Sequence, residues 1–267
     1  MALGTLILLA LIQGITEFLP ISSSGHLILL PELTGGADQG QAIDVAVHVG
    51  TLFAVMLYFW RDVGRLFRGG LHVVSGRVRT DDARLFLLLA IATIPVVMAG
   101  FVLKMSGLSD ALRSIKVIGW TMLIFGLVLY WYDRVSPVVR REAEFSLRDA
   151  IIMGLWQAVA LIPGTSRSGA TITGARMLGF NRYDGAKLAM LMSIPTIAAS
   201  GVLLGADVIG TADMGLIRDA SLAAGFAFAA ALLALTLMMR LLDAVSFTPY
   251  VIYRVVLGLI LLWIAYS

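Results

Sequence analysis

The chain has 267 residues, of which 59% are hydrophobic and 14% are charged, and its formal net charge is +3. Soluble domains carry roughly 45–50% apolar and about 25% charged residues, so this sequence lacks the polar surface that a water-soluble protein of its length needs. The composition therefore excludes a soluble enzyme, a disordered chain and a nucleic-acid-binding module. The chain has no cysteine, which excludes disulfides and thiolate metal sites.

Six apolar stretches are long enough to cross a bilayer as helices, since a span needs about 20 such residues. In chain order they are residues 42–60, 85–103, 115–132, 186–206, 219–239 and 250–266. The sequence therefore predicts an all-α polytopic membrane protein with six transmembrane helices. We expect residues 1–267 to form a single integral membrane domain.

Two further apolar segments, residues 3–30 and 149–180, are each interrupted by a proline and then by a cluster of Ser and Gly. Proline ends the preceding helix, and Ser and Gly favour a turn and a new helix N-terminus. Irregular backbone is tolerated at membrane depth only where it is buried in protein or lines a polar cavity. We therefore predict that both segments are re-entrant broken helices.

The two broken segments resemble each other, because Gln13 precedes Pro20 much as Gln157 precedes Pro163. Each broken segment is followed by three predicted spans, and an odd number of spans inverts the second repeat relative to the first. Inverted repeats with broken helices near the bilayer midplane are a known membrane architecture. The sequence thus predicts two inverted repeats at about 1–135 and 146–267.

Arginine and lysine are concentrated in four connecting loops, namely 61–84, 133–148, 181–187 and 240–249. Cytoplasmic loops carry such an excess of positive charge, so these four are predicted to be cytoplasmic. Both termini then lie outside, and the first broken segment opens to the outside. The same count places three further positions outside: Gly36, Ser109 and Thr211.

In the first broken segment, Gln13 and Glu17 are spaced i, i+4 and share one helix face. Ionisable groups inside a membrane are costly and are functional-site candidates by default. Glu17 beside a glutamine suits a hard cation such as Mg²⁺, which keeps waters and binds substrate phosphates. His26 follows three serines, and a Ser/His/Glu set is typical of serine hydrolases. A buried Glu17–His26 pair that bridges helices is the structural alternative.

In the second broken segment, Arg167 lies in P-G-T-S-R-S-G-A-T at the predicted N-terminus of a half-helix. Free backbone N–H groups, hydroxyls and a guanidinium meet there, and this combination binds phosphate. The alternative is a capped helix whose arginine reaches the membrane interface. Arg254 interrupts the last apolar stretch and is expected either to pair with Asp243 or to face the cavity. Together the segments predict a site for a phosphate or diphosphate whose remainder is apolar.

The stretches Q-G-I-T-E-F-L-P-I-S-S-S-G-H (13–26) and P-G-T-S-R-S-G-A-T (163–171) resemble the two signature motifs of the undecaprenyl-diphosphatase family, the bacitracin-resistance phosphatases. F-T-P-Y-V-I-Y-R (247–254) is also similar to the family. The resemblance implies a bacterial inner-membrane enzyme that removes one phosphate from C55 isoprenyl diphosphate and recycles the lipid carrier for peptidoglycan. It also implies dependence on Mg²⁺ or Ca²⁺ and an active site facing the periplasm. Many members have Glu where this chain has Gln13.

These observations give each candidate residue an expected role in phosphoryl transfer, where positioning and charge neutralisation supply most of the catalysis. Glu17 holds the metal, Gln13 is either a neutral ligand or a hydrogen-bond donor to the ligand, and Arg167 holds the diphosphate. Ser23 is the expected nucleophile, with His26 as base and then acid. Direct attack by water or by His26 stays open as a rival mechanism. Further phosphate-binding candidates are Ser22, Ser24, Thr165, Ser166, Ser168 and Thr171.

Two other functions are compatible with parts of this pattern. A polyprenyl-phosphate transporter or flippase fits inverted repeats and broken helices equally well. An intramembrane protease would use Ser and His, but it would leave Arg167 without a role. The partners that we expect are an isoprenoid lipid diphosphate and the lipid bilayer, with a homodimer left open and no nucleic acid.

Overall fold

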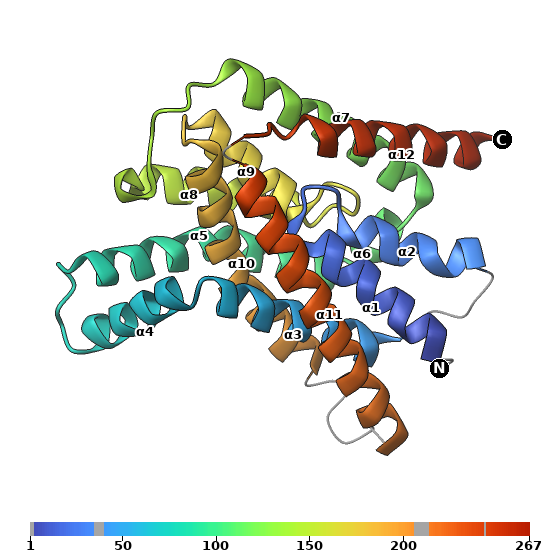
Figure 1. The fold of residues 1–267 in the computed structure, drawn as a ribbon, viewed down its shortest axis with the longest axis horizontal. Coiled ribbons are helices and arrows are strands. Elements are labelled where there is room, and N and C mark those ends of the chain that lie inside the picture. The colour runs from blue at the N-terminus through green and yellow to red at the C-terminus, as the bar shows by residue number, and fades with distance from the viewer. Residues whose placement is uncertain (1–2, 35–39, 206–213, 243) are drawn as a thin grey trace.

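The computed structural model describes residues 3–34, 40–205, 214–242 and 244–267, and within these ranges it is built from helices without a β-strand (Figure 1). This confirms the predicted all-α class. The elements in chain order are α1 (Leu3–Phe18), α2 (Ser23–Thr34), α3 (Gln41–Tyr58), α4 (Trp60–Val74), α5 (Asp81–Ser106), α6 (Leu108–Leu112), α7 (Ile115–Val135), the short 3₁₀ helix η1 (Glu142–Glu144), α8 (Leu147–Val159), α9 (Arg167–Met177), α10 (Arg182–Gly205), α11 (Met214–Leu241) and α12 (Thr248–Tyr266).

Among the described residues, six helices are long and apolar enough to cross a membrane: α3, α5, α7, α10, α11 and α12. They coincide with the six predicted stretches, which confirms the predicted spans. The two interrupted segments are also broken in the structure, between α1 and α2 and between α8 and α9. Their re-entry from opposite faces and the repeat boundaries stay predictions. Gly36, Thr211 and Asp243 lie outside the described residues.

The basic segment 61–84 was expected to be a loop, and this expectation is wrong for most of its length because α4 occupies Trp60–Val74. Apolar residues recur at helical spacing between its arginines, so one face of α4 packs against α5. The two helices approach closely at Gly69, where an added Cβ would lie 2.2 Å from the Asp82 carbonyl oxygen. Arg65 fixes this hairpin through ion pairs with Asp82 and Glu142.

Helix α11 crosses α1 and α3 at glycine contacts (Figure 1). A Cβ on Gly14 of α1 would lie 2.6 Å from the Ala227 carbonyl oxygen, and one on Gly50 of α3 would lie 2.2 Å from that of Ala224. Small residues at such crossings let helix backbones meet, which is how helices associate inside a bilayer. These crossings fix α1, which carries Gln13 and Glu17, against the rest of the bundle.

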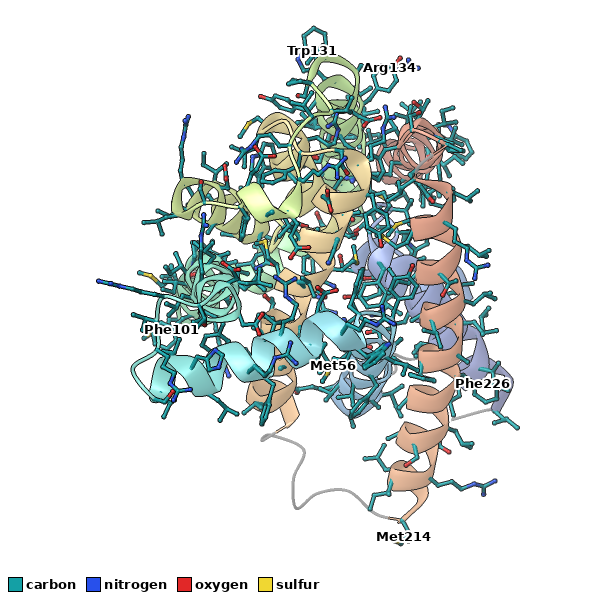
Figure 2. The ribbon with its side chains drawn as sticks, turned by 60° about the vertical axis from the view of Figure 1, so that its left-hand side comes forward. Met56, Phe101, Trp131, Arg134, Met214 and Phe226 are labelled. Atoms are coloured by element: carbon teal, nitrogen blue, oxygen red, sulfur yellow. The ribbon has the colours of Figure 1, made fainter. Side chains whose placement is uncertain are left out.

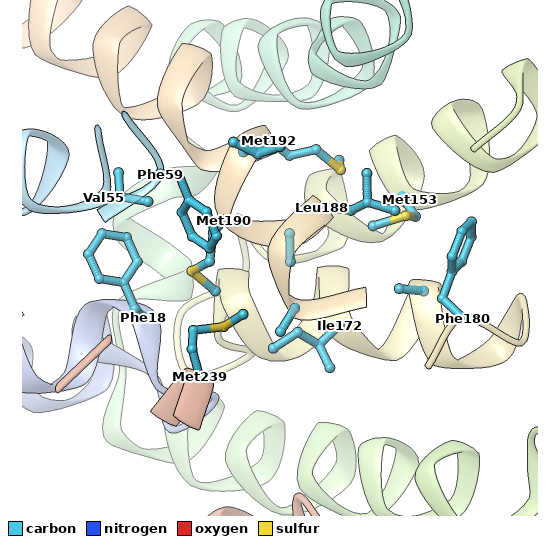
Figure 3. Close-up of a cluster of buried hydrophobic side chains, with 14 of the residues drawn as sticks. Phe18, Val55, Phe59, Met153, Ile172, Phe180, Leu188, Met190, Met192 and Met239 are labelled. Atoms are coloured by element: carbon cyan, nitrogen blue, oxygen red, sulfur yellow. The ribbon is translucent and has the colours of Figure 1, made fainter. Parts of the chain in front are cut away.

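The largest cluster of buried apolar side chains lies next to both helix breaks (Figure 3). It includes Phe18, the last residue of α1, and Ile172 in α9, which are packed with Met190 of α10 and Met239 of α11. By contrast, large apolar side chains on the bundle's periphery point outward, as Figure 2 shows for Phe101 and Trp131. The protein therefore packs an interior around the two breaks and presents an apolar exterior to lipid.

Candidate active site

The two helix breaks have the same local geometry at Ser22 and Ser166. Both serines have positive φ, 75° and 72°, and they are the two non-glycine residues with this conformation in the described chain. Each hydroxyl oxygen accepts the backbone N–H three residues later, at Gly25 (3.4 Å) and Gly169 (3.1 Å). Such left-handed conformations are strained for an L-residue and cluster at functional sites. Ser23 and Arg167, which directly follow these two serines, therefore occupy equivalent positions in the two broken segments.

Arg254 of α12 holds the backbones of both breaks together. Its guanidinium donates to the carbonyl oxygens of Pro20 (3.4 Å), Gly164 (3.1 Å) and Thr165 (2.8 Å), and its side chain is fully buried. These carbonyl dipoles replace the water that a buried cation loses. Arg254 was expected either to pair with Asp243 or to face the cavity. Asp243 lies outside the described residues. The contacts place the guanidinium against the loop backbones and not in the cavity.

Glu17 is the point where the two broken segments meet. Its Oε2 accepts from the Ser23 hydroxyl at 2.7 Å and from Gln13 Nε2 at 2.8 Å. Its Oε1 accepts from Arg167 Nη2 at 2.5 Å, across 150 residues of sequence. Buried charges occur in proteins when they are paired and hydrogen-bonded, as here. The structure thus brings together Gln13, Glu17, Ser23 and Arg167.

His26 lies away from this group. Its Nδ1 donates to the Ser22 carbonyl oxygen at 2.7 Å, and its Nε2 lies 2.5 Å from the Tyr253 hydroxyl, with the two rings stacked. With the proton on Nδ1, Nε2 is the acceptor of the tyrosine O–H. The expected hydrogen bond from Ser23 to His26 is therefore absent, and Glu17 takes that place. The Glu17–His26 pair, the structural alternative, is not formed either.

A cavity of about 330 Å³ opens beside the Glu17–Arg167 pair. Its polar lining includes Glu17, Ser23, Ser24, His48, Gln157, Ser166 and Arg167, and its apolar lining includes Val45, Val96, Ala160, Leu161 and Ile197. A second cavity of about 350 Å³ shares Ser24, Asp44, His48 and Leu161 with the first and continues past Leu103 and Leu112 to Arg113. The two cavities therefore offer polar surface for the head group of an amphipathic ligand and apolar surface for its tail.

The predicted phosphate-binding hydroxyls divide into two groups. Ser24 and Ser166 line the cavity beside Arg167. The Ser168 hydroxyl instead donates to the Leu19 carbonyl oxygen at 2.9 Å, and the Thr171 hydroxyl donates to the Arg167 carbonyl oxygen at 2.8 Å. Ser22 and Thr165 are buried in the loop turns. These four residues therefore do not line the cavity.

His48 on α3 is a cavity residue that sequence reasoning passed over. Its Nε2 lies 3.9 Å from Glu17 Oε2, while its Nδ1 donates to the Asp44 carbonyl oxygen. The available signal was its position four residues after Asp44, inside a predicted span, where two ionisable side chains share a helix face.

Hard oxygen ligands for a divalent cation are present at Glu17 and Gln13. Gln13 Oε1 is buried without a hydrogen-bond partner, and it belongs to the amide that already contacts Glu17. Mg²⁺ takes one or two protein oxygens and fills its remaining positions with waters and substrate phosphates. Within the described ranges, no three His, Asp or Glu side chains form a metal cluster. The residues present therefore fit a cation held partly by substrate and not a cage made by protein alone.

Comparison with known proteins finds that residues 6–260 match the family model described as bacitracin resistance protein BacA. The chain is 68% identical to the undecaprenyl-diphosphatase of Ruegeria pomeroyi and 67% identical to that of Dinoroseobacter shibae, each over 267 residues and the full length of both chains. It is 44% identical to undecaprenyl-diphosphatase 1 of Rhodospirillum rubrum over 272 aligned residues, which cover all of this chain and 96% of the relative.

Proposed function

The chain belongs to the bacitracin resistance protein BacA family, and on this premise we propose that it hydrolyses undecaprenyl diphosphate to the monophosphate and inorganic phosphate. The observation that carries the proposal is the meeting of Ser23, Glu17 and Arg167 beside a cavity with apolar walls. The relatives are named as diphosphatases, so the transporter alternative is not favoured. The enzyme is a multi-pass membrane protein with six apolar helices in its described part.

The first step that we propose is attack by Ser23 Oγ on the terminal phosphorus. As the new P–O bond forms, Glu17 Oε2 takes the hydroxyl proton, and the bond between phosphorus and the bridging oxygen breaks. The lipid monophosphate departs with the bridging oxygen. Glu17 is favoured over His26 as the base because a candidate base must lie within hydrogen-bond reach of the proton that it takes, and Glu17 Oε2 is 2.7 Å from Ser23 Oγ.

In the second step, water attacks the phosphoserine, the bond between phosphorus and Ser23 Oγ breaks, and Ser23 regains its proton from Glu17. Phosphate departs as dihydrogen phosphate with both protons of the water. Arg167 stabilises the charge in both steps. Its Nη1 is buried without a hydrogen-bond partner, so it can bind a phosphoryl oxygen while Nη2 stays on Glu17. Mg²⁺ or Ca²⁺, held by Glu17 and Gln13 Oε1, would neutralise further phosphate charge when bound.

The location that we propose is the bacterial inner membrane, with the site open to the periplasm. Two observations support this orientation. Arg65 and Lys187, from two basic segments, both bind Glu142 in a third, so the basic segments share one end of the bundle. The cavities extend instead toward Arg113, in the sparsely charged connection before α7. Periplasmic termini and a homodimer stay predictions.

The test is phosphate release from C55 isoprenyl diphosphate by the purified protein in detergent, with and without EDTA. A diphosphatase releases phosphate without any gradient, and a cation requirement makes the release sensitive to EDTA. A protein that binds the lipid but releases no phosphate with Mg²⁺ or Ca²⁺ would contradict the proposal and favour transport. Cleavage of peptides without metal would favour the protease.

A further inference from the structure

Gln157, near the C-terminal end of α8, is a fully buried amide with no hydrogen-bond partner in the described structure. Both its Nε2 and its Oε1 are unpaired, and the residue lines the active-site cavity. Buried polar atoms are almost always paired, so an amide with both ends unpaired needs an explanation. The glutamine interrupts an otherwise apolar stretch, where a methionine would fit the same space without this cost.

The matching glutamine of the first segment shows why this amide is unpaired. Gln13 and Gln157 each lie nine residues before the positive-φ serine of their segment. Gln13 Nε2 donates to Glu17, one helical turn later. The residue one turn after Gln157 is Leu161, which offers no acceptor. The second segment thus has a glutamine at the same position, but it has no acidic residue one turn later to accept from the amide. This glutamine lies on the wall of the cavity.

The unpaired atoms around the cavity match a phosphoryl group. Gln157 Nε2 and Arg167 Nη1 are both buried donors without acceptors, and both residues line the same space. A phosphoryl oxygen accepts from such donors, and Gln157 Oε1 remains free to accept from water. Glutamine side chains orient the attacking water in other phosphoryl-transfer enzymes.

We propose that Gln157 is a substrate-contacting residue, whose Nε2 binds the transferred phosphoryl group and whose Oε1 orients the water that hydrolyses the phosphoserine. This inference rests on the proposed function, since it assigns a further residue to the same reaction. It does not depend on His26 or on a metal ion.

The experiment compares the wild type with Gln157→Met, which keeps the volume and removes both polar atoms. Since the amide has no protein partner, the variant should unfold at the same temperature or higher, while kcat/KM falls about 10- to 100-fold, the value of a hydrogen bond to a charged group. Inorganic phosphate should raise the unfolding temperature of the wild type more than that of the variant. Leu155→Met, on the exposed face of α8, is the matched control and should change none of these values.

Each outcome separates the inference from the function. A Gln157→Met enzyme with wild-type kcat/KM overturns the inference, because cavity water then satisfies the amide. A parallel fall in unfolding temperature and activity also overturns it, because the role is then structural. If the wild type releases no phosphate from the lipid, the proposed function fails, and the phosphate-induced shift still reports whether Gln157 contacts the anion.

Discussion

Arg167 faces two anions, the Glu17 carboxylate that it already binds and the phosphoryl group that we propose it receives. We predict that Arg167→Ala lowers kcat/KM by about 10²–10³, since losing one preorganised charge contact to a developing transition state costs about this much. Arg167→Lys should recover little, because an ammonium cannot contact both groups through a planar fork. Phosphate release by the purified variants measures this, and an alanine variant within tenfold of the wild type would refute the assignment.

Ser23 and Glu17 form one hydrogen-bonded unit, so their substitutions should not add. Ser23→Ala and Glu17→Gln are each expected to lower kcat by about 10³ or more, with the double variant little worse than either. His26→Ala, which acts through the Ser22 turn and Tyr253, should lose less and should add to Ser23→Ala. Additive losses for Ser23 and Glu17 would separate their roles, and a phosphoenzyme trapped on His26 would exclude Ser23 as nucleophile.

At this scale the sequence predicted most of the residues that meet, but it wrongly placed His26 among them. Glu17, Ser23 and Arg167 were predictable because charges and hydroxyls inside apolar segments have few alternatives to a shared site. The direction of His26 depends on Tyr253, which lies 227 residues away. The sequence shows that Gln157 is followed one turn later by Leu161, which offers no acceptor, but its place on the cavity wall depends on packing between segments.

Among the elements, α12 matters most for the site, because its Arg254 joins the two helix breaks. We predict that Arg254→Met lowers the free energy of unfolding by about 3 kcal/mol or more, since several buried carbonyls lose their donor at a cost of about 1–3 kcal/mol each. Activity should fall with it. Thermal or denaturant unfolding in detergent measures the effect.

Arg113→Met is the control, because it removes an arginine that is exposed at the end of the second cavity. It should leave the unfolding free energy unchanged. Equal stability of the two variants would mean that the carbonyls bonded by Arg254 find other donors.

The membrane spans and the helix breaks were predictable from hydropathy and proline. Helix α4 was not predicted, because its many arginines suggested a loop although apolar residues recur between them at helical spacing.

For the whole molecule, the orientation can be tested directly because the chain has no cysteine and any introduced one is labelled without background. We predict that cysteine at Ser106, exposed at the end of α5, reacts with a membrane-impermeant maleimide in intact spheroplasts. Cysteine at Ser75, exposed after α4, should react only after permeabilisation. Ser24→Cys should react from outside and be protected by a diphosphate. Labelling of Ser24→Cys from the cytoplasmic side alone would overturn the periplasmic site.

The position of Arg254 in α12 also bears on how the enzyme is made. Synthesis proceeds from the N-terminus, so the serine and arginine turns enter the membrane before the helix whose guanidinium joins them. Until α12 is made, the turns lack this shared donor and are joined only by contacts such as those of Ser168 with Leu19 and of Arg167 with Glu17. We therefore expect the two turns to reach their final geometry only when α12 docks.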